Sequence, residues 1–170
     1  MRDVLIQPME PAHWERIRTI YVEGIATRNA TFETTAPSWN EWDSQHLPAA
    51  RLVALRAGKV VGWAALSPVS RRAAYRGVAE VSIYVAAGHR GEGVGRQLMA
   101  ELIRCAEAAG IWTLQAAVFP ENAATLRLHE SAGFRRVGYR ERIAQLDGKW
   151  RDTILLERRS RTVGLDLAGS

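Results

Sequence analysis

The stretch HRGEGVGRQ, residues 89–97, has glycines at three alternate positions between arginines. The segment before it, AEVSIYV (79–85), alternates apolar and polar residues and predicts a strand. The segment after it, residues 94–109, places apolar side chains four apart and predicts a helix. Glycines let a backbone approach a ligand closely, and a helix N-terminus offers free N–H groups and a partial positive charge. The stretch therefore predicts a strand–loop–helix unit that binds a phosphate group.

Two common phosphate-binding loops do not fit this stretch. A P-loop needs Lys and then Ser or Thr after its last glycine, whereas Arg96 and Gln97 follow Gly95. A dinucleotide-binding loop needs a glycine at position 96 and an acidic residue after the next strand, where AAVFP (116–120) has none. The pattern that remains is Arg90-x-x-Gly93-x-Gly95. From the loop alone, a glycine-rich turn that binds nothing stays open as an alternative.

The segments on either side of this unit predict a mixed α/β sheet. A strand is expected at residues 4–7, followed by helices over about 11–23 and 38–47, the second with a capping box. Residues 51–66 predict a hairpin with its turn at Gly58. After the helix that follows the glycine loop, we expect a buried strand (112–119), a helix from Asn122 to Gly133 and two last strands. Strands and helices in this order favour an α/β sheet with helices packed on it.

Composition excludes several classes of function. The 170 residues suit one domain, and no apolar run reaches the roughly 18 residues that a membrane helix needs. The N-terminus has no signal-peptide pattern, so we expect a cytoplasmic protein without a membrane partner. The net charge is +5, but the arginines are scattered and no aromatic–basic RNA motif occurs, so we expect no nucleic-acid partner. The charge suits an anionic ligand such as a phosphorylated cofactor.

The single cysteine, Cys105, excludes an intramolecular disulfide. It lies beside Leu102 and Ala106 in the helical pattern. We therefore expect a packing residue rather than a nucleophile, since a reactive thiolate needs an electropositive and partly open setting.

Longer segments place the loop in a family. They are IYVEGIATRNATFET (20–34), AYRGVAEVSIYV (74–85), NAATLRLHESAGF (122–134) and GKWRD (148–152). Together with the loop, they resemble the GNAT N-acetyltransferases, and within that family the phosphinothricin and methionine sulfoximine N-acetyltransferase branch. The resemblance runs from about Leu5 to Glu157.

The resemblance implies an acyl-CoA N-acyltransferase (GNAT) fold of class α/β. Its sheet would be mixed, mostly antiparallel, with splayed central strands and flanking helices. It also implies acetyl-CoA as co-substrate, no metal, a small-molecule amine as acceptor, and a homodimer. We assign the acetyltransferase domain to residues 1–159 and expect a flexible tail over residues 160–170.

The resemblance also assigns the residues that would hold acetyl-CoA. Backbone groups of Ile83 and Val85 would bind the pantetheine and acetyl carbonyl, although strand backbone is ordinarily occupied by pairing. Asn122 would contact the cofactor, and N-capping explains that residue equally well. The full expected set is Ile83, Tyr84, Val85, Arg90, Gly91, Glu92, Gly93, Val94, Gly95, Arg96 and Asn122.

Two residues are expected to act in catalysis. A protonated amine must lose a proton before its lone pair can attack a thioester, and Glu80 matches the carboxylate that serves as general base. A strand glutamate could instead pair with one of the many arginines. His129 occupies the position of a tyrosine that protonates the thiolate in many relatives. Its alternatives are a cofactor contact or a plain helix-surface residue.

The acceptor pocket is expected from two segments. Tyr75, Arg76 and Gly77 match one pocket-lining segment, and Phe32 and Glu33 match the other. Arg76 could bind a carboxylate or phosphinate with two parallel hydrogen bonds, or be a solvated loop arginine. Arginines suit a small anionic amino acid and repel a basic peptide.

These residues favour detoxification of an analogue such as phosphinothricin or methionine sulfoximine by acetylation of its α-amine, and whether this confers resistance stays open. Two alternatives remain: an acetyltransferase for a protein N-terminus or lysine, and a non-catalytic acyl-CoA-binding module, for which Glu80 has no use.

One segment departs from the branch pattern. Relatives carry a glycine and an aromatic-Lys-Phe run before GKWRD, whereas this chain has Ala144, Gln145, Leu146 and Asp147. Leu146 stands at the lysine position. The departure leaves the exact acceptor and the mode of subunit pairing open.

Overall fold

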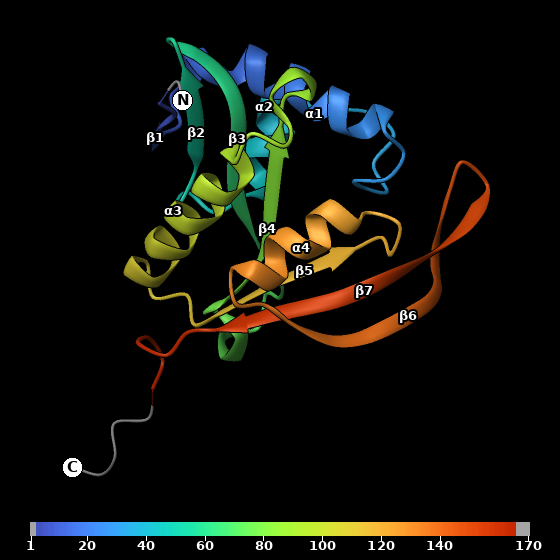
Figure 1. Cartoon of the computed structure of the whole chain (residues 1–170). Coiled ribbons are helices and arrows are strands. Elements are labelled where there is room, and N and C mark those ends of the chain that lie inside the picture. Colours follow the sequence, from blue (N-terminus) through green and yellow to red (C-terminus); the bar gives the residue numbers. More distant parts are fainter. Residues whose placement is uncertain (1–2, 166–170) are drawn as a thin grey trace.

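The computed structural model describes residues 3–165 and contains one seven-stranded sheet (Figure 1). The strand order is β1-β2-β3-β4-β5-β7-β6, and every neighbouring pair is antiparallel except β4 and β5. The strands are β1 (Leu5–Pro8), β2 (Leu52–Arg56), β3 (Lys59–Pro68), β4 (Val78–Val85), β5 (Thr113–Val118), β6 (Arg135–Leu146) and β7 (Lys149–Arg159). The predicted mixed, mostly antiparallel sheet is confirmed.

Four helices flank the sheet: α1 (Trp14–Ala26), α2 (Trp39–Gln45), α3 (Val94–Ala108) and α4 (Ala123–Ser131). The predicted order of elements is confirmed. The first helix runs three residues beyond its expected end, because Gly24 and Ile25 pack into the core. Gly24 lies so close to the ring of Tyr84 that a Cβ there would approach it to 2.6 Å. No helix in residues 3–165 is long and apolar enough to span a bilayer.

Each face of the sheet has its own core. On one face, α3 buries Leu98, Leu102 and Ala106 against the strands, and Figure 1 shows α4 beside α3 on this side. On the other face, α1 and α2 cover an aromatic cluster in which Tyr84 stacks on Trp63 with ring centroids 4.9 Å apart. The side chains of β4 alternate between these two cores, as the sequence pattern predicts.

The central strands β4 and β5 separate after three residue pairs. Val78, Ala79 and Glu80 pair with Thr113, Leu114 and Gln115, and the pairing stops there. Beyond this point β4 stays paired with β3, and β5 with β7, so the two halves of the sheet diverge as a V (Figure 1). The predicted splay is confirmed. It leaves the edge of residues 81–85 that faces β5 without a strand partner.

The segment that departs from the branch pattern forms the end of β6 and the first residue of the turn into β7. Asp147 and Gly148 both have positive φ, 51° and 75°, as a two-residue type I′ turn requires. Leu146, directly before the turn, is only 4% exposed. The Arg28 guanidinium lies 3.2 Å from the carboxylate of Asp147 and ties the turn to the loop after α1. The divergent residues therefore make a tight, anchored hairpin.

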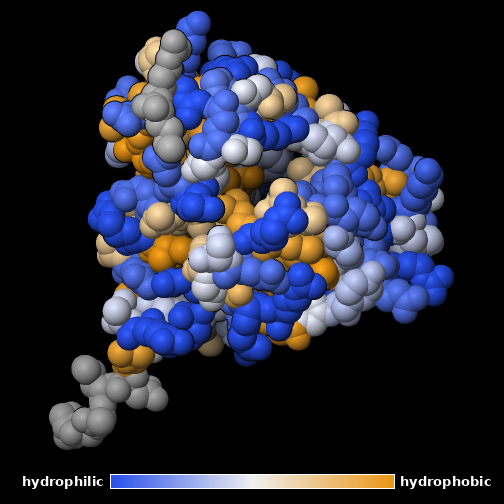
Figure 2. Space-filling model, in the orientation of Figure 1, coloured by the Kyte–Doolittle hydropathy of each residue, from blue (hydrophilic) through white to orange (hydrophobic). Residues whose placement is uncertain are grey.

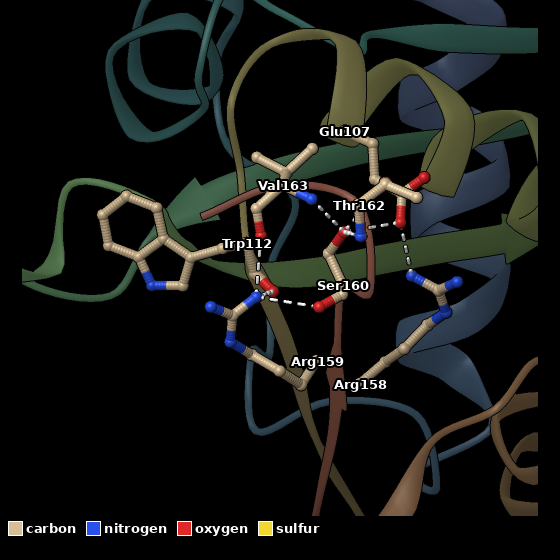
Figure 3. Close-up of polar contacts among 7 residues, drawn as sticks. All are labelled: Glu107, Trp112, Arg158, Arg159, Ser160, Thr162 and Val163. Atoms are coloured by element: carbon tan, nitrogen blue, oxygen red, sulfur yellow. Dashed lines mark hydrogen bonds and ion pairs between the residues drawn. The ribbon is translucent and has the colours of Figure 1, made fainter. Parts of the chain in front are cut away.

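The start of the expected tail makes hydrogen bonds to the domain as far as Gly164, and Figure 3 shows those up to Val163. The Arg159 guanidinium donates to the carbonyls of Trp112, Ser160, Val163 and Gly164. The Ser160 hydroxyl donates to Glu107 in the last turn of α3, 2.9 Å away. We call residues 159–164 the C-terminal clasp. Residues 160–164 of the expected tail are thus joined to the domain by hydrogen bonds, while residues 166–170 lie outside the described part of the chain.

The clasp also positions Trp112. Its backbone N–H donates to the carbonyl of Gly77 at 2.8 Å, and its carbonyl accepts from Ser160 at 2.7 Å. A Cβ on Gly77 would approach the indole ring to 2.1 Å, and one on Gly164 would approach the Trp112 side chain to 2.8 Å. Both contacts require a residue without a side chain. Trp112 is therefore held between the segment that begins β4 and the clasp.

Candidate active site

A cavity of about 760 Å³ lies along β4 beyond its pairing with β5. It borders α3 and α4 on one face and reaches Gly24 and Thr27 at the end of α1. Figure 2 shows this face hollowed in the middle, with hydrophobic surface among hydrophilic residues around the hollow. Ten of the eleven residues expected to hold acetyl-CoA line the cavity. They are Ile83, Tyr84, Val85, Arg90, Gly91, Gly93, Val94, Gly95, Arg96 and Asn122.

The glycine loop has the geometry of an anion-binding turn. Gly91 and Gly93 have φ of 77° and 84°, and nothing lies within 4 Å of a Cβ built on either. Gly93 is the N-cap of α3, and no side chain caps the helix there. The first N–H groups of α3 have no partner within the helix and are available to a ligand. Arg90 donates to the carbonyl of Val85 at 3.2 Å, which fixes the loop to the end of β4.

Glu92 is the one residue of the expected cofactor set that does not line the cavity. Its carboxylate forms an ion pair with Arg56 of β2 and lies 3.3 Å from the Nδ1 atom of His89. The hydrogen bond from Arg56, followed by that from His89, lowers the pKa of Glu92. Arg56 has no motif around it that predicts this contact, and only the folded sheet brings it to the loop.

The wall opposite the glycine loop comes from α4 and from the loop after α1. The Asn122 side chain accepts from the N–H of Thr125 at 3.2 Å and donates to the carbonyl of Asn29 at 3.0 Å. Asn122 therefore caps α4 and lines the cavity at once. Thr27, Asn29 and Ala30 also line it. Our sequence analysis missed these three, because loop residues without charge carry no signal for a ligand.

Glu80 lies on the opposite face of β4 from Ile83 and Val85. It is exposed, and the Gln115 side chain donates to its carboxylate at 3.3 Å. In residues 3–165 no arginine lies within ion-pair distance of Glu80. Its position is the last one paired with β5, so the carboxylate sits where the strands begin to part. A group there can accept a proton from an amine that approaches from the face of α1 and α2.

His129 is a buried residue of α4. It is 5% exposed, its Nδ1 atom lies 2.8 Å from the Thr125 carbonyl, and its ring packs edge-on against Phe134. Its Nε2 atom is buried without a hydrogen-bond partner among the described residues. Burial lowers the pKa of His129. The side chain is not among those that line the cavity, and its contacts are with Thr125 and Phe134.

The residues expected to bind the acceptor lie at two places outside the cavity wall. Phe32 packs edge-on against Phe119 with ring centroids 4.9 Å apart, and the exposed Glu33 follows it. The charge of Glu33 contributes to the raised pKa of Tyr84, which arises chiefly from burial. This pair therefore lies on the face of β4 that carries Glu80.

The other place is the start of β4. Tyr75 is 46% exposed and ends a short 3-10 turn (Ala73–Tyr75). The guanidinium of Arg76 lies 5.4 Å from the centroid of the Trp112 ring, and Gly77 lies against the same ring. One nitrogen of this guanidinium donates to the carbonyl of Ala73 at 3.3 Å. The other donors of the exposed group can bind a carboxylate or phosphinate.

Comparison with known proteins gives the family. Residues 14–134 match the model of the acetyltransferase (GNAT) family. The chain belongs to this family and is an acetyl-CoA-dependent N-acetyltransferase. No cluster of three or more potential metal-binding side chains occurs in residues 3–165.

Relatives in the same branch are well matched. The chain is 35% identical over 151 residues to a phosphinothricin N-acetyltransferase of Alcaligenes faecalis, covering 84% of this chain and 75% of that protein. It is 35% identical over 134 residues to an L-methionine sulfoximine/L-methionine sulfone acetyltransferase of Pseudomonas aeruginosa, covering 78% and 73%. A phosphinothricin acetyltransferase from Sinorhizobium meliloti, solved in complex with acetyl-CoA, superposes with a TM-score of 0.83 at 28% identity and covers 98% of both chains.

The buried His129 makes stability depend on pH. Its pKa is lowered in the folded chain, whereas in the unfolded chain it should be near the ordinary value of about 6.5. Below that pH the unfolded chain binds the proton first, so acidification favours unfolding. We expect the free energy of unfolding to fall less in His129→Leu than in the parent between about pH 7.5 and about pH 5. Urea denaturation at the two pH values measures this, and equal losses would contradict the burial of a neutral ring.

Proposed function

We propose that this enzyme transfers the acetyl group of acetyl-CoA to the α-amine of a small anionic amino-acid analogue of the phosphinothricin or methionine sulfoximine type. The observation that carries the proposal is the divergence of β4 and β5. A cavity with an anion-binding loop lies on one face of β4, and a carboxylate lies on the other, at the point where the strands part. The names of the relatives support the class of acceptor.

Acetyl-CoA supplies a thioester whose carbonyl carbon an amine can attack. In the proposal, the N–H groups at the start of α3 and the glycine loop bind the diphosphate. The unpaired edge of β4 at residues 81–85 binds the pantetheine arm by backbone hydrogen bonds, as an added strand would. Asn122 and the loop after α1 close the opposite wall. The residues fit this ligand, because positive φ and open space at Gly91 and Gly93 leave room for phosphate oxygens.

The reaction needs one proton acceptor and no covalent enzyme intermediate. Glu80 takes one proton from the ammonium group, and the neutral nitrogen attacks the thioester carbonyl to form the C–N bond. The C–S bond breaks, and the second proton of the nitrogen ends on the departing thiolate, which leaves as free CoA. A thiol is an acceptable leaving group because its pKa is about 8.5, so the step does not depend on His129. Cys105 is not used, because burial raises the pKa of its thiol and keeps it protonated.

In the same proposal, Arg76 and the segment of Phe32 and Glu33 recognise the acceptor. Arg76 binds the anionic end of the analogue while its ring partner Trp112 keeps the guanidinium in place. Three arginines lie close together in this region, Arg71, Arg72 and Arg76, and their positive charge would repel a basic peptide acceptor.

We also propose that the enzyme is a homodimer that pairs through the β6–β7 hairpin. Four large hydrophobic side chains of this hairpin are exposed: Val137, Tyr139, Ile143 and Trp150. β6 is also the edge strand of the sheet, so its outer backbone groups are free to pair with a second copy. Figure 1 shows the hairpin extending away from the helices. We expect light scattering to give the mass of two chains, and the mass of one chain would refute the dimer.

Replacement of the proposed general base tests the mechanism. We expect Glu80→Gln to lower kcat about 10²–10⁴-fold, because the amide keeps the shape but cannot accept the proton. The KM for acetyl-CoA should stay within about twofold, since Glu80 lies on the other face of β4. Steady-state assays of thiol release measure both constants. Cys105→Ala serves as the control and should retain parental turnover; unchanged turnover in Glu80→Gln would remove the residue from the mechanism.

A panel of acceptors tests the substrate class. Thiol release from acetyl-CoA is expected with phosphinothricin or methionine sulfoximine and not with basic peptides. Arg76→Ala should raise the KM for the analogue by about tenfold to a hundredfold, the range for the loss of one charge-assisted bidentate contact. Turnover on basic peptides alone would assign the enzyme to protein acetylation. Absence of turnover on every amine would leave an acyl-CoA-binding module.

A further inference from the structure

The anion-binding loop contains an acid. Glu92 stands between Gly91 and Gly93, the two residues whose open, positive-φ backbone makes room for phosphate oxygens. A carboxylate this close to a diphosphate would repel it, and the repulsion would be strong because both groups are negative at neutral pH. A loop that binds phosphate with a glutamate at its centre needs a compensating contact.

Arg56 supplies that contact from another part of the sheet. It lies at the end of β2, 36 residues before Glu92 in the sequence, and its guanidinium pairs with the Glu92 carboxylate. The same nitrogen lies 3.3 Å from Nδ1 of His89, which itself lines the cavity. The Arg56 side chain is only 17% exposed, whereas that of Glu92 is 43% exposed. The arginine is therefore fixed by the protein, and the glutamate is drawn back toward it.

We propose that Arg56 is a positioning residue for acetyl-CoA: it holds the Glu92 carboxylate away from the diphosphate and neutralises its charge. The inference rests on the proposed placement of the diphosphate on residues 90–96. Arg56 does not line the cavity, so it acts through Glu92 and the shape of the loop. The ionisable groups that meet here are Arg56, His89 and Glu92, while the neighbouring Arg90 is turned to the Val85 carbonyl.

A purely structural role for the pair predicts a different result. A partly exposed ion pair contributes little to the stability of a fold. If it served stability alone, its loss would shift the unfolding midpoint slightly and leave ligand binding unchanged. The proposed role predicts the reverse, since loss of Arg56 leaves an uncompensated negative charge beside the ligand's phosphates.

The test measures the affinity for CoA by calorimetry in a series of charge-neutralising variants. Arg56→Gln should raise the Kd for CoA at least about tenfold, because the Glu92 charge is no longer compensated. Glu92→Gln should bind CoA at least as tightly as the parent. Arg56→Gln/Glu92→Gln should return to within about threefold of the parent, because the repulsive charge has been removed. The defect of Arg56→Gln should also shrink as the salt concentration rises.

The matched control is Arg104→Gln, which removes an exposed ion pair with Glu101 on α3, and it should bind CoA as the parent does. Turnover with S-acetyl-pantetheine, which lacks the diphosphate, should be the same in Arg56→Gln and the parent. Parental CoA affinity in Arg56→Gln, or a double variant as weak as Arg56→Gln, would overturn the inference. Weaker binding of CoA by Glu92→Gln than by the parent would also overturn it. This substitution lies in an exposed loop and is expected to leave folding intact. The parent's own affinity for CoA tests the proposed cofactor site, so the two failures are distinguishable.

Discussion

Only three residue pairs hold β4 against β5, and the rest of the site depends on where this pairing stops. After Glu80 and Gln115 the two strands turn to different partners, β3 and β7. The edge of residues 81–85 that faces β5 therefore has no strand partner, and residues 83–85 border the cavity. A fully paired parallel sheet would have closed this opening. The cavity therefore exists only because the two strands separate after Glu80 and Gln115.

The divergence separates the chemistry between two faces of one strand. Ile83 and Val85 pack on the core beneath α3 and α4, whereas Glu80 and Tyr84 lie on the opposite face of β4. Tyr84 packs on the aromatic cluster there and also borders the cavity. The Tyr84 ring packs between Trp63 and Gly24, and it can lie this close to α1 because Gly24 has no Cβ atom. β4 is therefore fixed in rotation about its axis, because its aromatic side chain has only one place to lie. This fixation keeps both faces in register with the opening.

Local sequence patterns predicted the helices and strands, but they did not predict the contacts between residues far apart in the sequence. The hairpin at Gly58 and the capped α2 depend on neighbouring residues, so periodicity and turn chemistry predict them. The place of the glycine loop between β4 and α3 was predictable because its conformation depends on the glycines themselves. Arg56 was not, since it meets Glu92 only after β2 joins the sheet. His129 was expected at the catalytic centre by position in the family pattern, yet its packing on Phe134 is decided by tertiary structure. The burial of Leu146 likewise could not be predicted, because it depends on how the hairpin at Asp147 and Gly148 folds back.

The C-terminal clasp has a consequence for biosynthesis. The N-terminus of a chain leaves the ribosome first, and domains begin to fold during synthesis. Arg159 donates to the carbonyl of Trp112, and Gly164 packs against the Trp112 side chain. These contacts form only after both residues have left the exit tunnel of the ribosome. The packing of Trp112 beside Arg76 and Gly77 therefore depends on residues that are synthesised late.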